Sequence, residues 1–365
     1  MPSMNLMMKM TVVVLVFCLL AACAPVMDIP TQMVLPSPVV ILKAPKLSVT
    51  PYPTPTRAST WTPEVATPTV AGPLSTPDPF TPYFVNTLRS RPYGGGQLEN
   101  LGILGSNQNF VRYSIRYPSD GLQINGFMNL PNGNGPFPVI IVLHGYSDPS
   151  TYQTLDSTTD AADALTLQNY IVLHPNFRNF QPSDKGDTLF RSGYAVDILN
   201  LISILRTSAG IPGLFEHANA DRIGLWGHSM GGEIALKVAV VSPYIKAILL
   251  YAPLSGDEQK NCTFFNSKLG GTDNHMEMTA SAQDFAAISA NTYYKNITAA
   301  IQIHHGTGDS VIPATWSQQT CQQLKDTGRN VQCFFYPGAD HTFRAVYLKD
   351  FQYRVDDFFA YYLKK

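Results

Sequence analysis

Charged residues are sparse in this sequence, and neither sign dominates. Asp, Glu, Lys and Arg make up 14% of the 365 residues, with 25 basic against 26 acidic side chains and a formal net charge of −1. The basic residues form no run, which argues against a nucleic-acid partner. Hydrophobic residues account for 45% of the chain, enough for the core of one large domain.

Cysteine is also rare. The five cysteines have no spacing typical of a metal site, so we expect neither a metal ion nor a cofactor, and no feature indicates an obligate protein partner. Three of them, Cys262, Cys321 and Cys333, lie beyond residue 200. Cys321 and Cys333 are the closest pair of these three, and both a disulfide between them and three unpaired thiols remain open.

The apolar stretch near the N-terminus is too short to cross a bilayer. Lys9 is followed by MTVVVLVFCLL and then by small residues; this run is roughly a dozen residues long, whereas a membrane span needs about 20. A positive residue, a short apolar run and small residues are typical of an export signal, which we assign to residues 1–22. The sequence LAAC at 20–23 resembles the bacterial lipobox, and this resemblance implies that Cys23 carries a lipid anchor outside the cytoplasm. The alternative is a plain secretory signal.

Residues 23–92 differ in composition from the rest of the chain. They hold more than half of the 28 prolines, together with many Thr and Ser. Prolines at this density oppose helices and central strands. The segment is therefore predicted to be an extended tether between the anchored cysteine and a globular domain over residues 93–365.

The globular part has the pattern of an α/β domain. Residues 110–131 alternate apolar and polar side chains around an SDG turn, which predicts an antiparallel hairpin. Continuous apolar runs separated by helical stretches then predict a mostly parallel sheet with helices on both faces. These runs are 139–143, 170–173, 222–226, 247–251, 300–303 and 331–336.

One serine lies in the pattern G-x-S-x-G. Ser229 stands between Gly227 and Gly231, after a buried strand and before the helical pattern MGGEIALKVAVV. This strand–turn–helix context is the one that a nucleophile elbow requires, and the two small residues avoid a clash at the sharp turn. We therefore predict that Ser229 is a nucleophile.

A serine hydroxyl needs a base, and the base needs an acid that orients it. Among eight histidines, His341 follows the last predicted strand in a turn-rich loop and is the best candidate. His228 neighbours Ser229, but its side chain is expected to point elsewhere, and His304 and His305, at a strand end, are expected to be structural. Asp309 follows the preceding strand and is favoured as the acid, with Asp257 and Glu258 as the runners-up. Asp340 is adjacent to His341 and is poorly placed to contact its ring.

An oxyanion hole completes such a site. One donor is expected to be the backbone amide of Met230, at the start of the helix after the nucleophile. The other is expected from the HGY loop after residues 139–143, where Tyr146 offers either its amide or its hydroxyl.

Taken together, these segments resemble the α/β-hydrolase superfamily, and more narrowly its prolyl oligopeptidase and dienelactone hydrolase branch. The matching stretches are VLHGY, HPNFR, GHSMGG, HGTGDSVIP and FYPGADHTF, and they cover about residues 110–365. The resemblance implies an α/β-hydrolase fold with Ser229, Asp309 and His341 as nucleophile, acid and base.

We therefore expect an exported serine hydrolase acting on a small ester or a short peptide. Peptidases of this branch usually carry a β-propeller, whereas the N-terminal side here consists of a tether and one hairpin, so esters are favoured. A prolyl oligopeptidase-like peptidase and a non-catalytic binding lipoprotein with the same fold are the alternatives. Residues 256–285, which carry Phe264 and Phe265, are expected to form either a small cap over Ser229 or a surface loop.

Overall fold

The computed structural model describes residues 78–268 and 275–365. The expected export signal over residues 1–22, the lipid-bearing Cys23 and the tether up to residue 77 lie outside the described residues. Within the part of the chain that the structure describes, no helix is both long and apolar enough to cross a membrane.

The domain begins earlier than the sequence predicted. The short 3₁₀ helix η1 (Thr81–Tyr83) and the helix α1 (Val85–Ser90) fall in residues 78–92, which the proline content had assigned to the tether. Val85 and Leu88 are buried in the main core. The boundary at residue 92 was therefore wrong, because two apolar side chains spaced one helical turn apart dock this segment despite its prolines.

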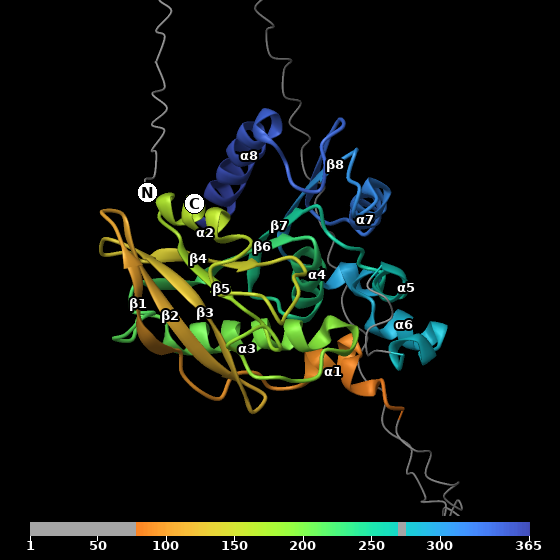
Figure 1. Ribbon diagram of the computed structural model, residues 1–365, viewed down its shortest axis with the longest axis horizontal. Helices are drawn as coiled ribbons and strands as arrows, with labels where there is room; N and C mark the ends of the chain where they lie inside the picture. Colours follow the sequence, from red (N-terminus) through yellow and green to blue (C-terminus); the bar gives the residue numbers. More distant parts are fainter. Residues whose placement is uncertain (1–77, 269–274) are drawn as a thin grey trace, which may run out of the picture. The chain divides into compact units, whose positions relative to one another are not determined.

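A single mixed sheet forms the centre of the domain (Figure 1). Its strand order in the described residues is β1-β2-β3-β5-β4-β6-β7-β8-β9. The pairs β1–β2, β2–β3 and β3–β5 are antiparallel, and all pairs from β5 to β9 are parallel. The strands are β1 (Glu99–Ser106), β2 (Phe110–Ser119), β3 (Leu122–Pro131), β4 (Phe137–Leu143), β5 (Ile171–Pro175), β6 (Ala218–His228), β7 (Ile245–Tyr251), β8 (Ala300–Gly306) and β9 (Val331–Tyr336).

The predicted hairpin and the six predicted core strands are all present. Asp120 and Gly121 make the turn between β2 and β3 with φ values of 52° and 84°. The edge strand β1 was not predicted from the sequence. All eight of its residues are exposed, so the strand carries no alternation of apolar and polar side chains that would mark one buried face.

Helices cover both faces of the sheet, as predicted. On one face α1, α3, α4 and α7 pack together with Val139, Ile141 and Leu143 of β4; on the other, α2 and α8 pack with Ile140 and Val142. Figure 1 shows α2 and α8 on the opposite side of the sheet from α3. The remaining helices are α2 (Thr159–Leu167), α3 (Ser192–Ser208), α4 (Met230–Val241), α5 (Glu258–Lys268), α6 (Ala282–Ile288), α7 (Ala314–Asp326) and α8 (Ala345–Leu363), with 3₁₀ turns η2 (Leu189–Arg191), η3 (Glu277–Thr279) and η4 (Ala290–Asn296).

Two of the cysteines form a disulfide. Cys321 of α7 is bonded to Cys333 of β9, while Cys262 of α5 is a buried free thiol. The pairing left open by the sequence is thus present, and it ties a covering helix to the last strand of the sheet.

Candidate active site

Ser229 occupies a sharp turn between β6 and α4. Its backbone has φ 55° and ψ −118°, a region that a residue with a Cβ atom rarely adopts. Two backbone hydrogen bonds hold the turn: the Ser229 amide donates to the Tyr251 carbonyl at 2.9 Å, and the Leu254 amide donates to the Ser229 carbonyl at 3.1 Å. The strand–turn–helix predicted from G-x-S-x-G is therefore the local structure.

Gly227 and Gly231 allow this turn because other backbone atoms lie where their side chains would be. A Cβ atom at Gly227 would lie 2.4 Å from the carbonyl oxygen of Gly231. A Cβ atom at Gly231 would lie 2.0 Å from the carbonyl oxygen of Leu143, at the end of β4. The two glycines thus let α4 start directly against β6 and β4.

Asp309 and His341 are brought together by the loops that follow β8 and β9. Nδ1 of His341 lies 2.8 Å from Oδ2 of Asp309. The other carboxylate oxygen accepts hydrogen bonds from the amides of Val311 and Ile312, both at 2.8 Å. Because β8 and β9 are parallel neighbours, their carboxyl ends place both loops at the same edge of the sheet as Ser229.

The surroundings of Asp309 favour its ionised form. Burial by itself would raise the pKa of this carboxyl, but hydrogen bonds from His305, His341 and the Ile312 amide outweigh burial and hold the pKa well below its usual range. The side chain of Asp309 has no solvent exposure, whereas that of His341 is 15% exposed. A buried carboxylate beneath a partly exposed imidazole can stabilise the protonated form of that imidazole.

The other candidate acids lie elsewhere. Oδ1 of Asp257 accepts from the Lys260 amide at 3.2 Å, and Glu258 pairs with Lys237 at 3.1 Å. Asp340 accepts from the amides of Ser310 and His341 rather than contacting the His341 ring. The structure thus brings Asp309, and not these three, to the His341 ring.

His305 is a residue that sequence reasoning assigned to a structural role without linking it to the acid. Its Nε2 lies 2.9 Å from Oδ2 of Asp309 and 3.1 Å from the Ile312 carbonyl, while its Nδ1 lies 2.7 Å from the Ser317 hydroxyl. The signal available in the sequence was its position four residues before Asp309, at the end of a buried strand. The adjacent His304 contacts Tyr336 and has a structural role, as expected.

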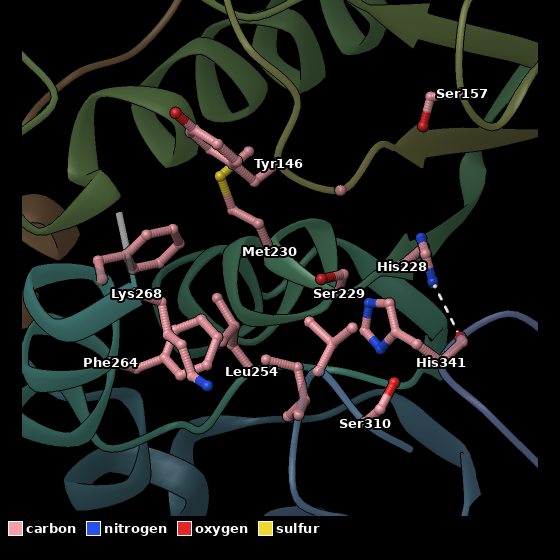
Figure 2. A pocket seen from close by; sticks show the side chains of 14 residues that line it. Tyr146, Ser157, His228, Ser229, Met230, Leu254, Phe264, Lys268, Ser310 and His341 are labelled. Carbon is pink, nitrogen blue, oxygen red and sulfur yellow. Dashed lines mark hydrogen bonds between the residues drawn. The ribbon is translucent and has the colours of Figure 1, made fainter. Parts of the chain in front are cut away.

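The side chain of His228 lies closer to the site than expected. Sequence reasoning directed it away from Ser229, but its ring lies 4.9 Å from the ring of His341, measured between centroids, and its Nε2 lies 3.4 Å from the His341 carbonyl oxygen. Burial, reinforced by the nearby His341, lowers the pKa of His228 to about 3. His228 is therefore neutral at ordinary pH and forms part of the wall of the site (Figure 2).

The loop after β4 lies directly against Ser229. A Cβ atom at Gly145 would be 3.2 Å from the Ser229 Cβ, and the ring of His144 supports the loop through the carbonyl oxygens of Gly145 and Asn176 at 2.7 and 3.0 Å. Met230 is the first residue of α4, so its amide is one of the first-turn donors without an intrahelical partner. In Figure 2 the Tyr146 ring extends away from Ser229, and it packs against Phe265 at 5.9 Å between centroids.

A pocket of about 420 Å³ opens over Ser229 and His341. Figure 2 shows the His341 ring beside Ser229, with Phe264 and Lys268 on one side of the serine and His228 and Ser157 on the other. Phe264 and Phe265 belong to α5, inside the segment expected to form a cap, and both line the pocket. Of the two interpretations of residues 256–285, the structure thus supports a cap wall for 258–268; residues 269–274 lie outside the described residues.

The cap helix α5 is anchored by buried charged groups. Nε of Arg191 lies 2.8 Å from Glu233 of α4, and its Nη2 contacts Glu258 of α5. Lys237 lies 3.2 Å from Glu233 and 3.1 Å from Glu258. The Arg191 guanidinium also lies 4.8 Å from the ring centre of Phe265. The network therefore joins α4, the helix that follows Ser229, to a side chain that lines the pocket.

The fold and the arrangement at its strand ends define an α/β-hydrolase, as the sequence resemblance implied. The dienelactone hydrolase family matches residues 124–356, which is more than half of the chain. This protein belongs to that family.

Individual relatives include both esterases and peptidases. A Schizosaccharomyces pombe protein named as a dipeptidyl aminopeptidase is 24% identical over 267 residues, covering 70% of this chain and 30% of the relative. An acetylxylan esterase of Xylanibacter ruminicola is 26% identical over 204 residues, covering 53% of this chain and 39% of the relative. The chain thus spans about a third of the length of these two relatives.

Solved structures share the fold. The crystal structure of acetyl xylan esterase 1 from Thermoanaerobacterium sp. superposes with a TM-score of 0.58 at 16% sequence identity, and covers 77% of this chain and 92% of that esterase. Among the described residues, no group of three or more His, Cys, Asp or Glu side chains is arranged to hold a metal ion.

Proposed function

We propose that this protein is a serine hydrolase that cleaves carboxylic esters through an acyl-enzyme intermediate. The observation that carries the proposal is the contact of 2.8 Å between His341 and Asp309, placed beside a serine in a strained elbow at the floor of a pocket. Membership of the dienelactone hydrolase family supports the same reaction class.

In the proposed mechanism Ser229 attacks the substrate carbonyl carbon while His341 takes the hydroxyl proton. Asp309 holds the His341 tautomer and stabilises the imidazolium that forms. His341 then gives the proton to the departing alcohol oxygen, leaving the acyl group on Ser229. A water molecule, deprotonated by His341, hydrolyses the acyl-enzyme and restores the free serine.

The oxyanion of the tetrahedral intermediate is assigned to the backbone amides of Met230 and Tyr146. The position of Gly145 against Ser229 supports the Tyr146 amide as the second donor, and the Tyr146 ring, which packs on Phe265 and extends away from Ser229, argues against its hydroxyl. Preorganised amides of this kind each contribute about 10²–10³ in rate.

The pocket lining supports an ester with an uncharged or anionic acyl group. Apolar side chains dominate the walls, including Leu254, Phe264 and Phe265. Beside them lies the positively charged side chain of Lys268. A peptide N-terminus is cationic, and this lining suits it less well. A short-peptide substrate is the second candidate, which the S. pombe relative supports.

Labelling with a fluorophosphonate probe tests the nucleophile. The wild type should label and Ser229→Ala should not; equal labelling of the two proteins, or none of either, would contradict the proposal and favour a non-catalytic binding protein. A panel of short p-nitrophenyl esters against aminoacyl and prolyl amides then decides the substrate class. Faster turnover of the amides would assign the protein as a peptidase.

We further propose that the domain is exported and held to a membrane by acylated Cys23. The LAAC sequence supports the anchor, and the Cys321–Cys333 disulfide supports an oxidising compartment. Metabolic labelling with a fatty acid analogue should mark the wild type and leave Cys23→Ala unlabelled. Recovery of both proteins without lipid from the cytoplasmic fraction would contradict this proposal.

A further inference from the structure

A second and larger hollow lies between α2 and α8. It has a volume of about 1040 Å³, and four of the aromatic residues that line it are buried. These are Trp226, Tyr251, Phe343 and Phe351, each with no more than 6% of its surface exposed. We refer to this hollow as the α2–α8 groove.

The groove is continuous with the candidate active site. Ser157 and His228 line both the pocket over Ser229 and the α2–α8 groove. Figure 2 shows these two residues on the opposite side of Ser229 from Phe264 and Lys268 of the cap. A substrate whose carbonyl group lies at Ser229 therefore has two directions in which to extend: toward the cap, or past His228 into the groove.

The chemistry of the proposed reaction assigns the two directions. His341 must donate its proton to the departing alcohol oxygen, so the alcohol half of the ester lies on the His341 side of Ser229. Thr342 and Phe343, which directly follow His341, both line the groove. The acyl half then lies on the other side, against Phe264 and Phe265.

We propose that the α2–α8 groove binds the leaving-group half of the substrate, and that this half is a bulky, uncharged, apolar alcohol. The proposal rests on the ester-hydrolase function proposed above. The walls of the groove match an apolar alcohol, because Leu167 of α2 and Leu348 of α8 line the groove with 54% and 47% of their surfaces exposed. Exposed apolar side chains flanking an aromatic floor favour an apolar ligand.

The charges around the groove do not select an ionic ligand. Asp160, Lys349 and Asp356 line it, so both signs are present. No described ion pair joins Lys349 to Asp160 or Asp356, and Asp356 accepts a hydrogen bond from Gln352 at 2.9 Å. An uncharged alcohol avoids the cost of removing a charge from water in this apolar environment.

The first test varies the alcohol while the acyl group stays fixed. Ethyl, butyl and hexyl acetate have leaving groups of nearly equal basicity, so their kcat/KM values report on binding of the alkyl chain. Burial of each added methylene is expected to raise kcat/KM by up to about fourfold, so hexyl acetate should exceed ethyl acetate by at least about tenfold. The matched acyl series, ethyl acetate to ethyl hexanoate, measures the cap side separately.

The second test fills the groove. Ala164 of α2 lines it, and Ala164→Trp should lower kcat/KM for hexyl acetate by about tenfold while leaving ethyl acetate within about twofold of the wild type. Ala286→Trp, at an exposed position of α6, is the matched control and should change neither. Leu348→Arg tests the opposite wall, at an exposed position where folding should tolerate the change, and should give the same selective loss.

The outcomes separate this inference from the function on which it depends. Hydrolysis of ethyl acetate with no gain along the alcohol series, or identical behaviour of the Ala164→Trp and Ala286→Trp proteins, overturns the groove assignment and leaves the esterase intact. A change in molecular mass of Ala164→Trp by light scattering, with an unchanged alcohol series, would make the groove an interface between copies and also overturns it. If no ester is hydrolysed and Ser229 does not label, the proposed function fails, and the leaving-group assignment fails with it.

Discussion

Nε2 of His305 lies 2.9 Å from Oδ2 of Asp309, the same oxygen that contacts His341. The carboxylate therefore lies between two imidazoles, one of them fully buried and held by Ser317. Nε2 of His305 faces two acceptors, the Ile312 carbonyl at 3.1 Å and Asp309, so the proton of the neutral ring lies on Nε2 and the Ser317 hydroxyl donates to Nδ1. In the proposed mechanism His305 is thus a positioning residue, since it holds the carboxylate oxygen that orients His341.

Substitution of His305 should slow catalysis without weakening substrate binding. In His305→Asn the carboxylate of Asp309 loses a charge-assisted hydrogen bond worth about 1.5–3 kcal/mol, and its position relative to His341 becomes less defined. We expect kcat to fall at least about tenfold with KM nearly unchanged. His304→Gln is the control, because that buried histidine contacts Tyr336 rather than Asp309; equal effects of the two substitutions on kcat would contradict the positioning role.

The glycines of the elbow should not tolerate alanine. A Cβ atom at Gly231 would lie 2.0 Å from a backbone oxygen of β4, so the start of α4 must move away from the sheet. We expect Gly231→Ala to cost more than about 2 kcal/mol in the free energy of unfolding and to abolish probe labelling of Ser229. Urea denaturation measures the first effect. Gly105→Ala, on the exposed strand β1 where a Cβ would meet nothing within 4 Å, should leave both properties unchanged.

The buried charges beneath the cap should be sensitive to the loss of a single cation. Lys237 is buried between Glu233 and Glu258, and in Lys237→Met the cation that still contacts both carboxylates is Arg191. Breaking a buried pair in this way costs about 3–5 kcal/mol. Lys246→Met, at an exposed position of β7, should change the free energy of unfolding by less than about 0.5 kcal/mol. Equal midpoints for the two variants would show that the network does not hold the fold.

Stability should decrease as the pH falls from 7 to 5. Burial, as the largest cause, lowers the pKa values of His174, His228 and His304 to about 3, whereas an unfolded histidine has a pKa of about 6.5. Below pH 6.5 the unfolded chain therefore binds more protons than the folded one, and each histidine removes up to about 2 kcal/mol of stability by pH 5. Asp309 does not contribute to the change in stability between pH 7 and pH 5. Its carboxyl is ionised in both the folded and the unfolded chain until the pH falls to about 4, the ordinary pKa of an aspartate.

Two substitutions check the origin of this pH dependence in thermal or urea unfolding. His304→Gln should reduce the difference in unfolding free energy between pH 7 and pH 5, because one buried base is removed. His275→Gln changes an exposed histidine and should leave the difference as it is. If the unfolding free energy of the wild type were the same at pH 7 and pH 5, the buried histidines would not have the lowered pKa values on which this prediction depends.

Local patterns in the sequence predicted most of the architecture. Continuous apolar runs predicted the six core strands because most of their residues are buried, although β9 is only partly buried. The alternation over residues 110–131 predicted the hairpin for a different reason, since successive side chains of a strand point to opposite faces of the sheet. The strand β1 escaped prediction because all of its residues are exposed. The docked helix α1 escaped because its two buried residues stand among prolines, and composition over a long window hides a single apolar pair.

Part of the candidate site could likewise be predicted from the sequence, and part could not. The order of Ser229, Asp309 and His341 could be predicted because each residue follows a recognisable strand. The contact of His305 with Asp309 could not, since it depends on how the loop after β8 folds back onto the end of its own strand. The network of Arg191, Lys237 and their carboxylate partners could not be predicted from the sequence either, because it joins segments that are distant in sequence and carry no shared pattern.

The order of the strands also determines when the protein can act. A ribosome supplies Ser229 first, Asp309 next and His341 last, and α8, which packs against the sheet beside them, follows His341. A partly synthesised chain, or one trimmed from its C-terminal end past β9, therefore holds Ser229 without His341. In the proposed mechanism Ser229 therefore stays inert until the loop after the last strand is in place, which couples hydrolysis to completion of the fold.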